Sequence, residues 1–349
     1  MSRFNDVKRI KIFFKDPNKK SIFKIIKEVF ILTITKKEIP FYYFKYAYRK
    51  NITNYLDYHS TKELTLMGNS HKLHNKDLNP IIENKLFFSF FCEQNNLKTP
   101  KLISYNFKTS FFYNNKTVQL KNKDAVTAFF KTIFKDTNVE ALFFRPPSEQ
   151  GGKGCFKISK ASVNKDIDKT FEFLTQGTFV HTEIIKQHDA INNIHNKAVN
   201  TLRIISILTE DNEVEFIGGF YRFGVGKSVV DNASSGGFIV GVNMADGTLK
   251  KTGHYLSGYG GAEIYEHPDS GFKFEGFKIP FYEDICNNLR EAVTFLPDRY
   301  IGWDIAITNN GPLIVECNSK PHLPLSDIAH GGMLNNKHMK TLLNIAKSK

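Results

Sequence analysis

The residues of this sequence that suggest chemistry most directly lie in residues 300–321, YIGWDIAITNNGPLIVECNSKP. Two apolar runs flank the Asn-Asn-Gly sequence at 309–311, which is typical of a β-hairpin turn. Because side chains alternate between the two faces of a strand, Glu316 and Asn318 share one face. Carboxylate and amide oxygens are the ligands that Mg²⁺ prefers. The segment therefore suggests a site for one or two Mg²⁺ ions that carry phosphate groups.

The position of Asp304 relative to these residues depends on the length of the turn. A three-residue loop at 309–311, with glycine in the left-handed conformation, sets Asp304 directly opposite Glu316, with Cβ atoms roughly 5 Å apart. A loop one residue shorter pairs Asp304 with Cys317 and separates the carboxylates. Acidic residues on hairpins are usually solvated, but Glu316 interrupts an apolar strand, where a carboxylate is costly unless it is paired or binds a metal. We therefore predict that Asp304, Glu316 and Asn318 bind the metal.

A glycine-rich turn, SEQGGKG at 148–154, joins two predicted strands. Gly151, Gly152 and Gly154 allow backbone N–H groups to approach an anion closely. Arg145 ends the preceding strand, where its cation would meet phosphates under the turn. The turn is not a Walker A loop, which requires a Lys-Ser or Lys-Thr end that opens a helix, and the strand that follows excludes a Rossmann loop. A plain hairpin turn is the alternative.

Further charged and amide groups enter or end apolar strands. Arg203 enters the strand RIISIL, where a guanidinium suits phosphate or carboxylate recognition. Arg222 precedes a second glycine turn, in which Asn232 is followed by SSGG, and this combination could hold a transferring phosphoryl group. Glu183 ends another apolar strand and could accept hydrogen bonds from a nucleotide. The alternatives are side chains that reach water at strand ends and a surface loop with incidental charges.

Composition and charge limit the class of protein. The 349 residues, of which 41% are hydrophobic, suffice for two or three domains with a sizeable core. The net charge is +13, and the first 60 residues contain 14 lysines and arginines against 5 acidic residues, which suggests an anionic partner. The four cysteines are far apart, which argues against structural zinc and a disulfide framework. We expect a cytoplasmic protein, because no signal peptide is recognisable.

Hydrophobic periodicity predicts interspersed helices and strands, and hence the α+β class. Helices are predicted over 21–35, 84–96, 124–135 and 281–294 and from Met333 onward, and strands over 101–105, 179–185, 200–208, 214–223 and 237–242, with two more around the glycine turn. We predict a basic, largely helical N-terminal region over 1–80, a region with the phosphate loop over 81–188 and a metal-binding region over 189–349.

The helix at 21–35 has two interpretations. Ile22, Ile25, Ile26, Val29 and Leu32 fall on one face at helical spacing. A core helix with a basic outer face is favoured over a helix that lies on a membrane surface. The stretch is too short and too charged to span a bilayer. Residues 41–58 combine tyrosines with basic residues, but they form no recognised nucleic-acid motif, and we expect no nucleic-acid partner.

Taken together, the motifs resemble the ATP-grasp superfamily, and most closely its sugar-transfer-associated branch. The motifs in chain order are NKL at 84–86, LFFRPPSEQGGKG at 142–154, TEIIKQH at 182–188, VNTLRI at 199–204, VDNASSGG at 230–237 and IGWDIAITNNGPLIVECN at 301–318. The order of the whole set, with Glu-x-Asn on a strand after Gly-Trp-Asp, is more specific than any single motif. The resemblance covers roughly residues 80 to 325 and implies an ATP site between two α+β subdomains.

The resemblance also implies roles for individual residues. Lys85 and Arg145 would contact phosphates or adenine, the glycine loop would cover the phosphates, and Glu183 with the backbone of Ile185 would meet adenine. The metal ligands would be Asp304, Glu316 and Asn318, whereas Arg203 and Arg222 would stabilise the reacting acyl phosphate. The sequence departs from the usual family pattern at Arg145, where a lysine is usual.

The reaction that this implies joins a carboxylate to an amine with ATP and Mg²⁺. The expected substrates are a carboxylate of a sugar or surface polysaccharide and an amino acid. The basic N-terminal segment fits an acidic or membrane-held glycan, which would place the protein at the inner face of the membrane. A sugar kinase on the same fold and a non-catalytic binding protein of a glycan-assembly complex are the alternatives.

Overall fold

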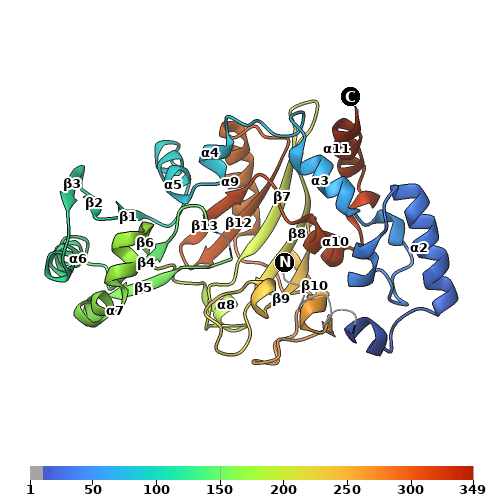
Figure 1. The fold of residues 1–349 in the computed structure, drawn as a ribbon, viewed down its shortest axis with the longest axis horizontal. Coiled ribbons are helices and arrows are strands. Elements are labelled where there is room, and N and C mark those ends of the chain that lie inside the picture. The colour runs from blue at the N-terminus through green and yellow to red at the C-terminus, as the bar shows by residue number, and fades with distance from the viewer. Residues whose placement is uncertain (1–10, 150, 349) are drawn as a thin grey trace. The chain divides into compact units, whose positions relative to one another are not determined.

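The computed structural model describes residues 11–149 and 151–348 (Figure 1). The first ten residues of the predicted N-terminal region, and Gln150 of the glycine turn, lie outside the described residues. The chain forms two compact units. Unit 1 consists of residues 11–78, 187–312 and 317–348, and unit 2 of residues 79–149, 151–186 and 313–316. The predicted division into three domains stays a prediction.

Unit 2 is built on a six-stranded sheet in the order β3-β2-β1-β6-β4-β5. The strands are β1 (Leu102–Phe107), β2 (Ser110–Tyr113), β3 (Lys116–Gln119), β4 (Ala141–Arg145), β5 (Phe156–Ser159) and β6 (Thr178–Glu183). Two amphipathic helices, α6 (Lys123–Thr137) and α7 (Val163–Gln176), bury Phe130 and Leu174 against Phe144 and Phe179 of the sheet. The short helices α4 (Asn79–Ile82), α5 (Lys85–Gln94) and η3 (Lys160–Ser162) complete the unit.

Unit 1 is built on a seven-stranded sheet in the order β11-β10-β9-β8-β7-β12-β13. The strands are β7 (Leu202–Leu208), β8 (Val214–Phe223), β9 (Phe238–Asn243), β10 (Thr248–Tyr255), β11 (Glu263–Ile264), β12 (Tyr300–Thr308) and β13 (Gly311–Asn318). The accompanying helices are α8 (Asp189–Asn192), η4 (Ala233–Ser235), η5 (Ser257–Tyr259), α9 (Tyr282–Phe295), α10 (Leu323–His330), η6 (Met333–Asn335) and α11 (Lys337–Lys347).

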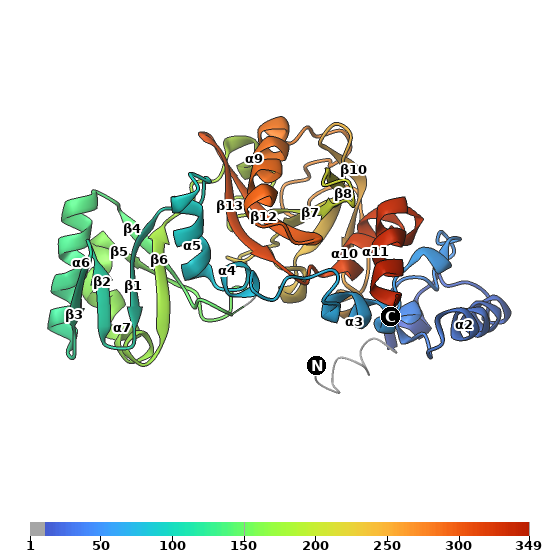
Figure 2. The same ribbon diagram turned by 90° about the horizontal axis from the view of Figure 1, so that it is seen from above.

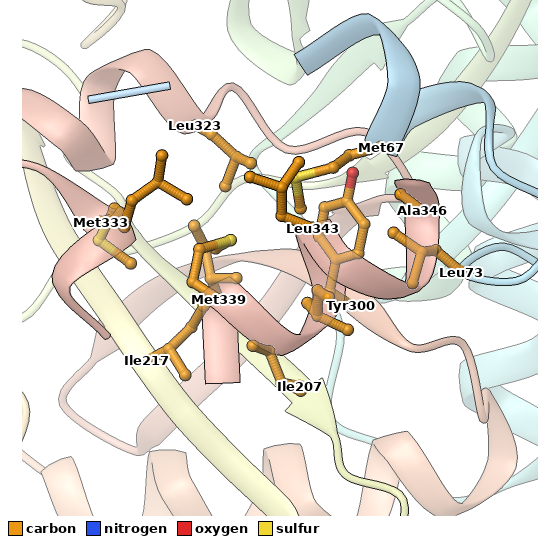
Figure 3. Close-up of a cluster of buried hydrophobic side chains, with 13 residues drawn as sticks. Met67, Leu73, Ile207, Ile217, Tyr300, Leu323, Met333, Met339, Leu343 and Ala346 are labelled. Carbon is orange, nitrogen blue, oxygen red and sulfur yellow. The ribbon is translucent and has the colours of Figure 1, made fainter. Parts of the chain in front are cut away.

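Residues from the start and the end of the chain share one core in unit 1. Met67 and Leu73 pack with Ile205 and Ile217 of the sheet and with Leu343 of α11 (Figure 3). Met67 belongs to α3 (Thr61–Asn69), which begins with a capping box between Ser60 and Glu63. The N-terminal segment is therefore held to the C-terminal helices by buried apolar side chains, and also by polar contacts such as those of Glu63 with Lys347 and of His59 with Asp327.

The N-terminal segment of unit 1 also contains α2 (Ile22–Lys36), η1 (Phe41–Lys45) and η2 (Tyr55–Asp57). The buried side of α2 holds Ile25, Glu28 and Leu32. The carboxylate of Glu28 accepts hydrogen bonds of 2.6 Å from Lys20 Nζ and from the Tyr43 hydroxyl. Glu28 therefore shares the buried side with Ile25 and Leu32 of the predicted face, because a carboxylate inside a protein must keep its partners.

The outer face of α2 contains exposed lysines, Lys24 and Lys27, as predicted, but it also contains an apolar stripe that was not predicted. The exposed apolar residues of the helix are Ile22, Phe23, Ile26, Phe30 and Ile34. Two residues of the predicted core face, Ile22 and Ile26, therefore point to solvent. Among the described residues, no helix has both the length and the apolar character needed to cross a membrane.

Candidate functional site

The turn between β12 and β13 has the conformation that the three-residue loop requires. Gly311 has a φ of 110°, whereas neither Asn309 nor Asn310 has a positive φ. The Thr308 hydroxyl donates to the carbonyl oxygen of Gly311 across 2.8 Å and closes the turn. A residue other than glycine would be strained at this φ.

Asp304 on β12 is the centre of a buried charge cluster in unit 1. The side chain of Arg203, on the neighbouring strand β7, lies in direct register with Asp304 and donates from Nε and Nη2 to both carboxylate oxygens. Arg222 Nη2 on β8 lies 2.8 Å from Oδ2 of the same carboxylate. Asp304 is 2% exposed. Burial raises the pKa of Asp304, but the charges of Arg203 and Arg222 outweigh it and hold the pKa well below its usual range.

A second carboxylate extends the cluster. Asp231 Oδ2 accepts from the backbone N–H of Thr201 across 2.9 Å and lies 3.5 Å from Arg222 Nε. The Thr201 hydroxyl donates to Asp231 and accepts from Arg222 Nε. Burial raises the pKa of Asp231, whereas Arg222 and Thr201 lower it. Arg222 is thus oriented by one carboxylate on each side.

Two amide residues that the sequence singles out also lie in unit 1. Asn232 is half-buried directly before η4, and its carbonyl oxygen accepts from the N–H groups of Ser235 and Gly237. Asn318 ends β13, and its buried Nδ2 has no hydrogen-bond partner among the described residues. A buried donor without a partner is costly. Asn318 therefore fits a bound group that carries oxygen atoms, such as a phosphate.

Unit 2 brings together three of the predicted residues. Lys85 opens α5 after its N-cap residue Asn84, and its Nζ lies 3.3 Å from Glu316 Oε2 and 2.7 Å from the carbonyl oxygen of Glu149. Arg145 is 6% exposed and donates from Nη1 to the carbonyl oxygen of Val315 across 3.4 Å. Burial lowers the pKa of Arg145, although the charge of Glu316 opposes the shift.

The charge balance of this cluster favours an anion. Two cations face one carboxylate, and Arg145 Nε is buried without a hydrogen-bond partner in the described chain. A desolvated guanidinium with an open donor suits phosphate oxygens. Arg145 therefore fits the phosphate role that the family position implies, even though a lysine is usual there.

The glycine turn between β4 and β5 presents backbone to solvent. Gly151, Gly152 and Gly154 have φ values of 71°, 72° and 74°. The first two are exposed, and no heavy atom lies within 4 Å of a Cβ built on Gly151, so conformation rather than space requires glycine there. Lys85 ties the turn to α5 through the Glu149 carbonyl.

The predicted adenine contacts remain predictions. Glu183 ends β6, and both its backbone N–H and its carboxylate already have partners, which are the carbonyl oxygen and the N–H of Lys101. Ile185 is half-buried in the segment that follows. The three-ligand metal site also stays a prediction, because Asp304 and Asn318 belong to unit 1 and Glu316 to unit 2.

The comparison with protein families decides the classification. Residues 69–342 match the family described as "Sugar-transfer associated ATP-grasp". The chain belongs to this family. The match confirms the predicted ATP-grasp family, and the mixed helices and strands of the structure confirm the predicted α+β class. None of the curated proteins with which the sequence was compared is significantly similar to it.

Several solved structures are similar to this ATP-grasp protein. D-alanyl-alanine synthetase A from Vibrio cholerae has 11% identity and a TM-score of 0.44, and the match covers 77% of this chain and 66% of that one. The ATP-grasp ligase PsnB, in a complex with a precursor variant, Mg and ADP, has 13% identity and a TM-score of 0.44, with 79% and 62% covered. D-alanine–D-alanine ligase from Bacillus anthracis has 14% identity and a TM-score of 0.42, with 76% and 69% covered. The chain thus spans less than two thirds of the first two structures.

The ATP-grasp protein also has a cavity of about 470 Å³ in unit 1 that the sequence does not predict. Its charged and aromatic lining includes Lys45, Lys320 and Tyr42, and the Tyr42 hydroxyl is buried without a partner among the described residues. Pro321 of the lining packs against β12, since a Cβ on Gly302 would lie 2.6 Å from Pro321 Cβ and 3.3 Å from Arg203 Cδ. The cavity therefore adjoins the strand pair that carries Arg203 and Asp304.

Only a weak signal in the sequence points to this cavity. Lys320 and His322 lie two and four residues after Asn318, so their position after the strand of the predicted metal ligands was the available signal. A larger cavity of about 740 Å³ lies between residues 11–18, 49–51 and 260–265. None of the predicted site residues lines it.

Proposed function

We propose that this ATP-grasp protein joins an amine to a carboxylate of a sugar or surface polysaccharide, with release of ADP and phosphate. The observation that supports this most directly is the pair of guanidinium groups on Asp304, next to a cavity that contains two lysines. Asp304 and Asp231 balance the two arginines, whereas Lys45 and Lys320 of the cavity outnumber its one carboxylate, Asp327. This excess of positive charge suits a substrate that brings carboxylate or phosphate groups.

The protein's own side chains have distinct tasks in this proposal. Arg203 and Arg222 stabilise negative charge on the oxygens of the reacting carboxyl group, because the strand register and Asp231 hold them in fixed directions. Lys85 and Arg145 hold phosphate oxygens. Asp304, Glu316 and Asn318 would hold Mg²⁺, which supplies charge neutralisation for phosphoryl transfer when it is bound. For this, Asp304 would have to exchange a contact with Arg203 or Arg222 for the metal, because the two arginines occupy both of its oxygens.

The cavity suits an acidic sugar. The tyrosines of its lining are Tyr42, Tyr46, Tyr58 and Tyr300. Tyrosine rings can cover the apolar face of a sugar while their hydroxyl groups exchange hydrogen bonds with it. Lys45 and Lys320 would pair with the carboxylate. A volume of about 470 Å³ lies within the usual range for small-molecule sites.

A substrate matrix tests the reaction class. The purified full chain is incubated with ATP, Mg²⁺, a set of uronic acids and a set of amino acids, and released phosphate and amide products are measured. Phosphate release that requires both a carboxylate and an amine supports the proposal. A phosphorylated sugar formed without any amine would identify a kinase instead. Absence of nucleotide binding would identify a non-catalytic protein.

The acceptor site is tested by neutralising the lysines of the cavity. We expect Lys45→Gln and Lys320→Gln each to raise the KM for the carboxylate substrate about tenfold, through loss of a charge-assisted contact, while the KM for ATP is unchanged. Lys116→Gln, at an exposed position of β3, is the matched control. Unchanged KM values for both cavity variants would place the acceptor elsewhere.

A further inference from the structure

The outer face of α2 presents an apolar stripe that no other part of the described chain covers. Phe23 is 87% exposed, Phe30 65%, and Ile22, Ile26 and Ile34 between 53% and 60%. At 3.6 residues per turn these five side chains fall within a sector of about 120°. Isolated exposed apolar residues are ordinary, but a continuous stripe of this kind marks an interaction surface.

Residues close to α2 in sequence are also apolar and exposed. Phe14, Ile39 and Phe41 are 64%, 65% and 72% exposed. Phe14 precedes and the other two follow α2, the helix labelled in Figure 2. The opposite side of α2 is occupied, because Ile25 and Leu32 pack with Tyr43, Ala47 and Tyr48. The exposed stripe is therefore distinct from the side of α2 that packs in the core.

The charges around the stripe are positive. Lys24 and Lys27 of α2 are exposed, and so are Lys15 and Lys37 beside it. Three acidic residues near α2 have partners within the chain: Glu28 pairs with Lys20, Asp16 with Arg49, and Glu38 accepts from the backbone N–H groups of Thr61 and Lys62. The surface that carries the stripe thus combines exposed aromatic and aliphatic side chains with basic ones.

We propose that this face of α2 binds the surface of an anionic lipid bilayer. In this proposal α2 lies parallel to the membrane surface, with Phe23 and Phe30 at the boundary between headgroups and acyl chains. Lys24 and Lys27 contact the headgroups. A helix that is apolar on one sector and flanked by lysines has the composition of interfacial helices. Each lysine near an anionic surface strengthens binding by about fivefold. This inference concerns a surface separate from the ligation site, and it does not rest on the proposed reaction.

Vesicle sedimentation of the full chain tests the proposal. We expect binding to vesicles of phosphatidylcholine with about one third phosphatidylglycerol, and much weaker binding to pure phosphatidylcholine. Phe23→Glu/Phe30→Glu should reduce the binding constant at least about tenfold, since two charges replace buried apolar area. Lys24→Gln/Lys27→Gln should reduce it about 25-fold, and added salt should weaken wild-type binding.

Controls separate a lipid surface from other occupants. Phe107→Glu/Val118→Glu changes two exposed apolar residues of unit 2, which are 44% and 38% exposed, and should leave vesicle binding intact. Thermal unfolding checks that each variant is folded. The proposal is overturned if the two α2 variants bind vesicles as well as wild type. It is also overturned if the wild type ignores vesicles and forms a dimer that Phe23→Glu/Phe30→Glu dissociates, because the stripe would then bind a second copy.

Discussion

The charge cluster around Asp304 leads to a quantitative prediction for Asp304→Asn. The wild-type carboxylate of Asp304 accepts two hydrogen bonds from Arg203 and contacts one nitrogen of Arg222, and Asp304 is 2% exposed. Asparagine keeps one acceptor oxygen but removes the charge. In the variant, Arg222 still has Asp231 as a charged partner at 3.5 Å. Arg203 is therefore the guanidinium that is left without a charged partner, and most of the lost stability comes from its interaction. Removing one partner of a buried ion pair typically costs about 3–5 kcal/mol, and we expect about 3 kcal/mol here.

Urea unfolding of the full chain measures this loss of stability. The midpoint should fall while the m-value stays constant, because the surface exposed on unfolding does not change. Asp211→Asn, at an exposed position, is the control and should be neutral within about 0.5 kcal/mol. Arg203→Met/Asp304→Leu should recover more than half of the loss, since it removes the orphaned cation. A loss below about 1 kcal/mol in Asp304→Asn would refute the reasoning.

The pKa of Asp304 adds a pH dependence to the same experiment. The pKa is held well below its usual range in the folded protein, whereas an unfolded aspartate titrates near about 3.9. The resulting stability is fully present above about pH 4 and is lost as the pH falls below it. Between about pH 4 and pH 2 the wild type should therefore lose stability more steeply than Asp304→Asn. Equal slopes would count against the ion cluster as its source.

Three further predictions concern other residues. Glu316→Gln should abolish turnover but leave the circular dichroism spectrum unchanged, because the Glu316 side chain is 25% exposed and the fold does not depend on it. Glu140→Gln, whose side chain is 80% exposed, is the control and should remain active. Gly151→Ala should destabilise the turn by about 1 kcal/mol, since its φ is 71°, and should raise the KM for ATP without affecting the KM for the carboxylate. Burial and the charge of Lys250 lower the pKa of His330 to about 4, so the unfolding free energy should fall as the pH drops from about 6.5 to 4, and the fall should be smaller in His330→Gln. A flat wild-type profile in that window would contradict the last prediction.

The sequence correctly predicted elements whose ends are marked by strong local signals. The start of α5 follows from Asn84, whose side chain accepts from the N–H groups of Leu86 and Phe87. Asn309-Asn310-Gly311 correctly indicated a left-handed glycine. In contrast, β2 and β3 were missed. Their turn uses Asn114 and Asn115 at positive φ, and all four residues of β3 are exposed, so no apolar alternation marks that strand.

The contacts of the candidate site could not be predicted from local patterns. Arg203 and Asp304 were both named, but their ion pair depends on the pairing of β7 with β12, which joins residues 101 positions apart. The predicted core face of α2 is confirmed at Ile25, Val29 and Leu32 but wrong at Ile22 and Ile26, for a related reason. Periodicity ranks Ile22 and Ile26 as core residues, whereas the buried pair of Lys20 and Glu28 decides which face packs. Long-range polar contacts leave no periodic signature.

The strand β13 is shared between the two units, and this affects any attempt to dissect the protein. Residues 313–316 belong to unit 2, although residues 187–312 of unit 1 separate them in sequence from the rest of unit 2, residues 79–186. A fragment cut at 79 and 186 would lack the Glu316 carboxylate beside Lys85 and the Val315 carbonyl beside Arg145. Such a fragment would leave both cations without these partners. The two halves of this protein are therefore not separable modules, and residues 79–186 expressed alone should be less stable than in the full chain.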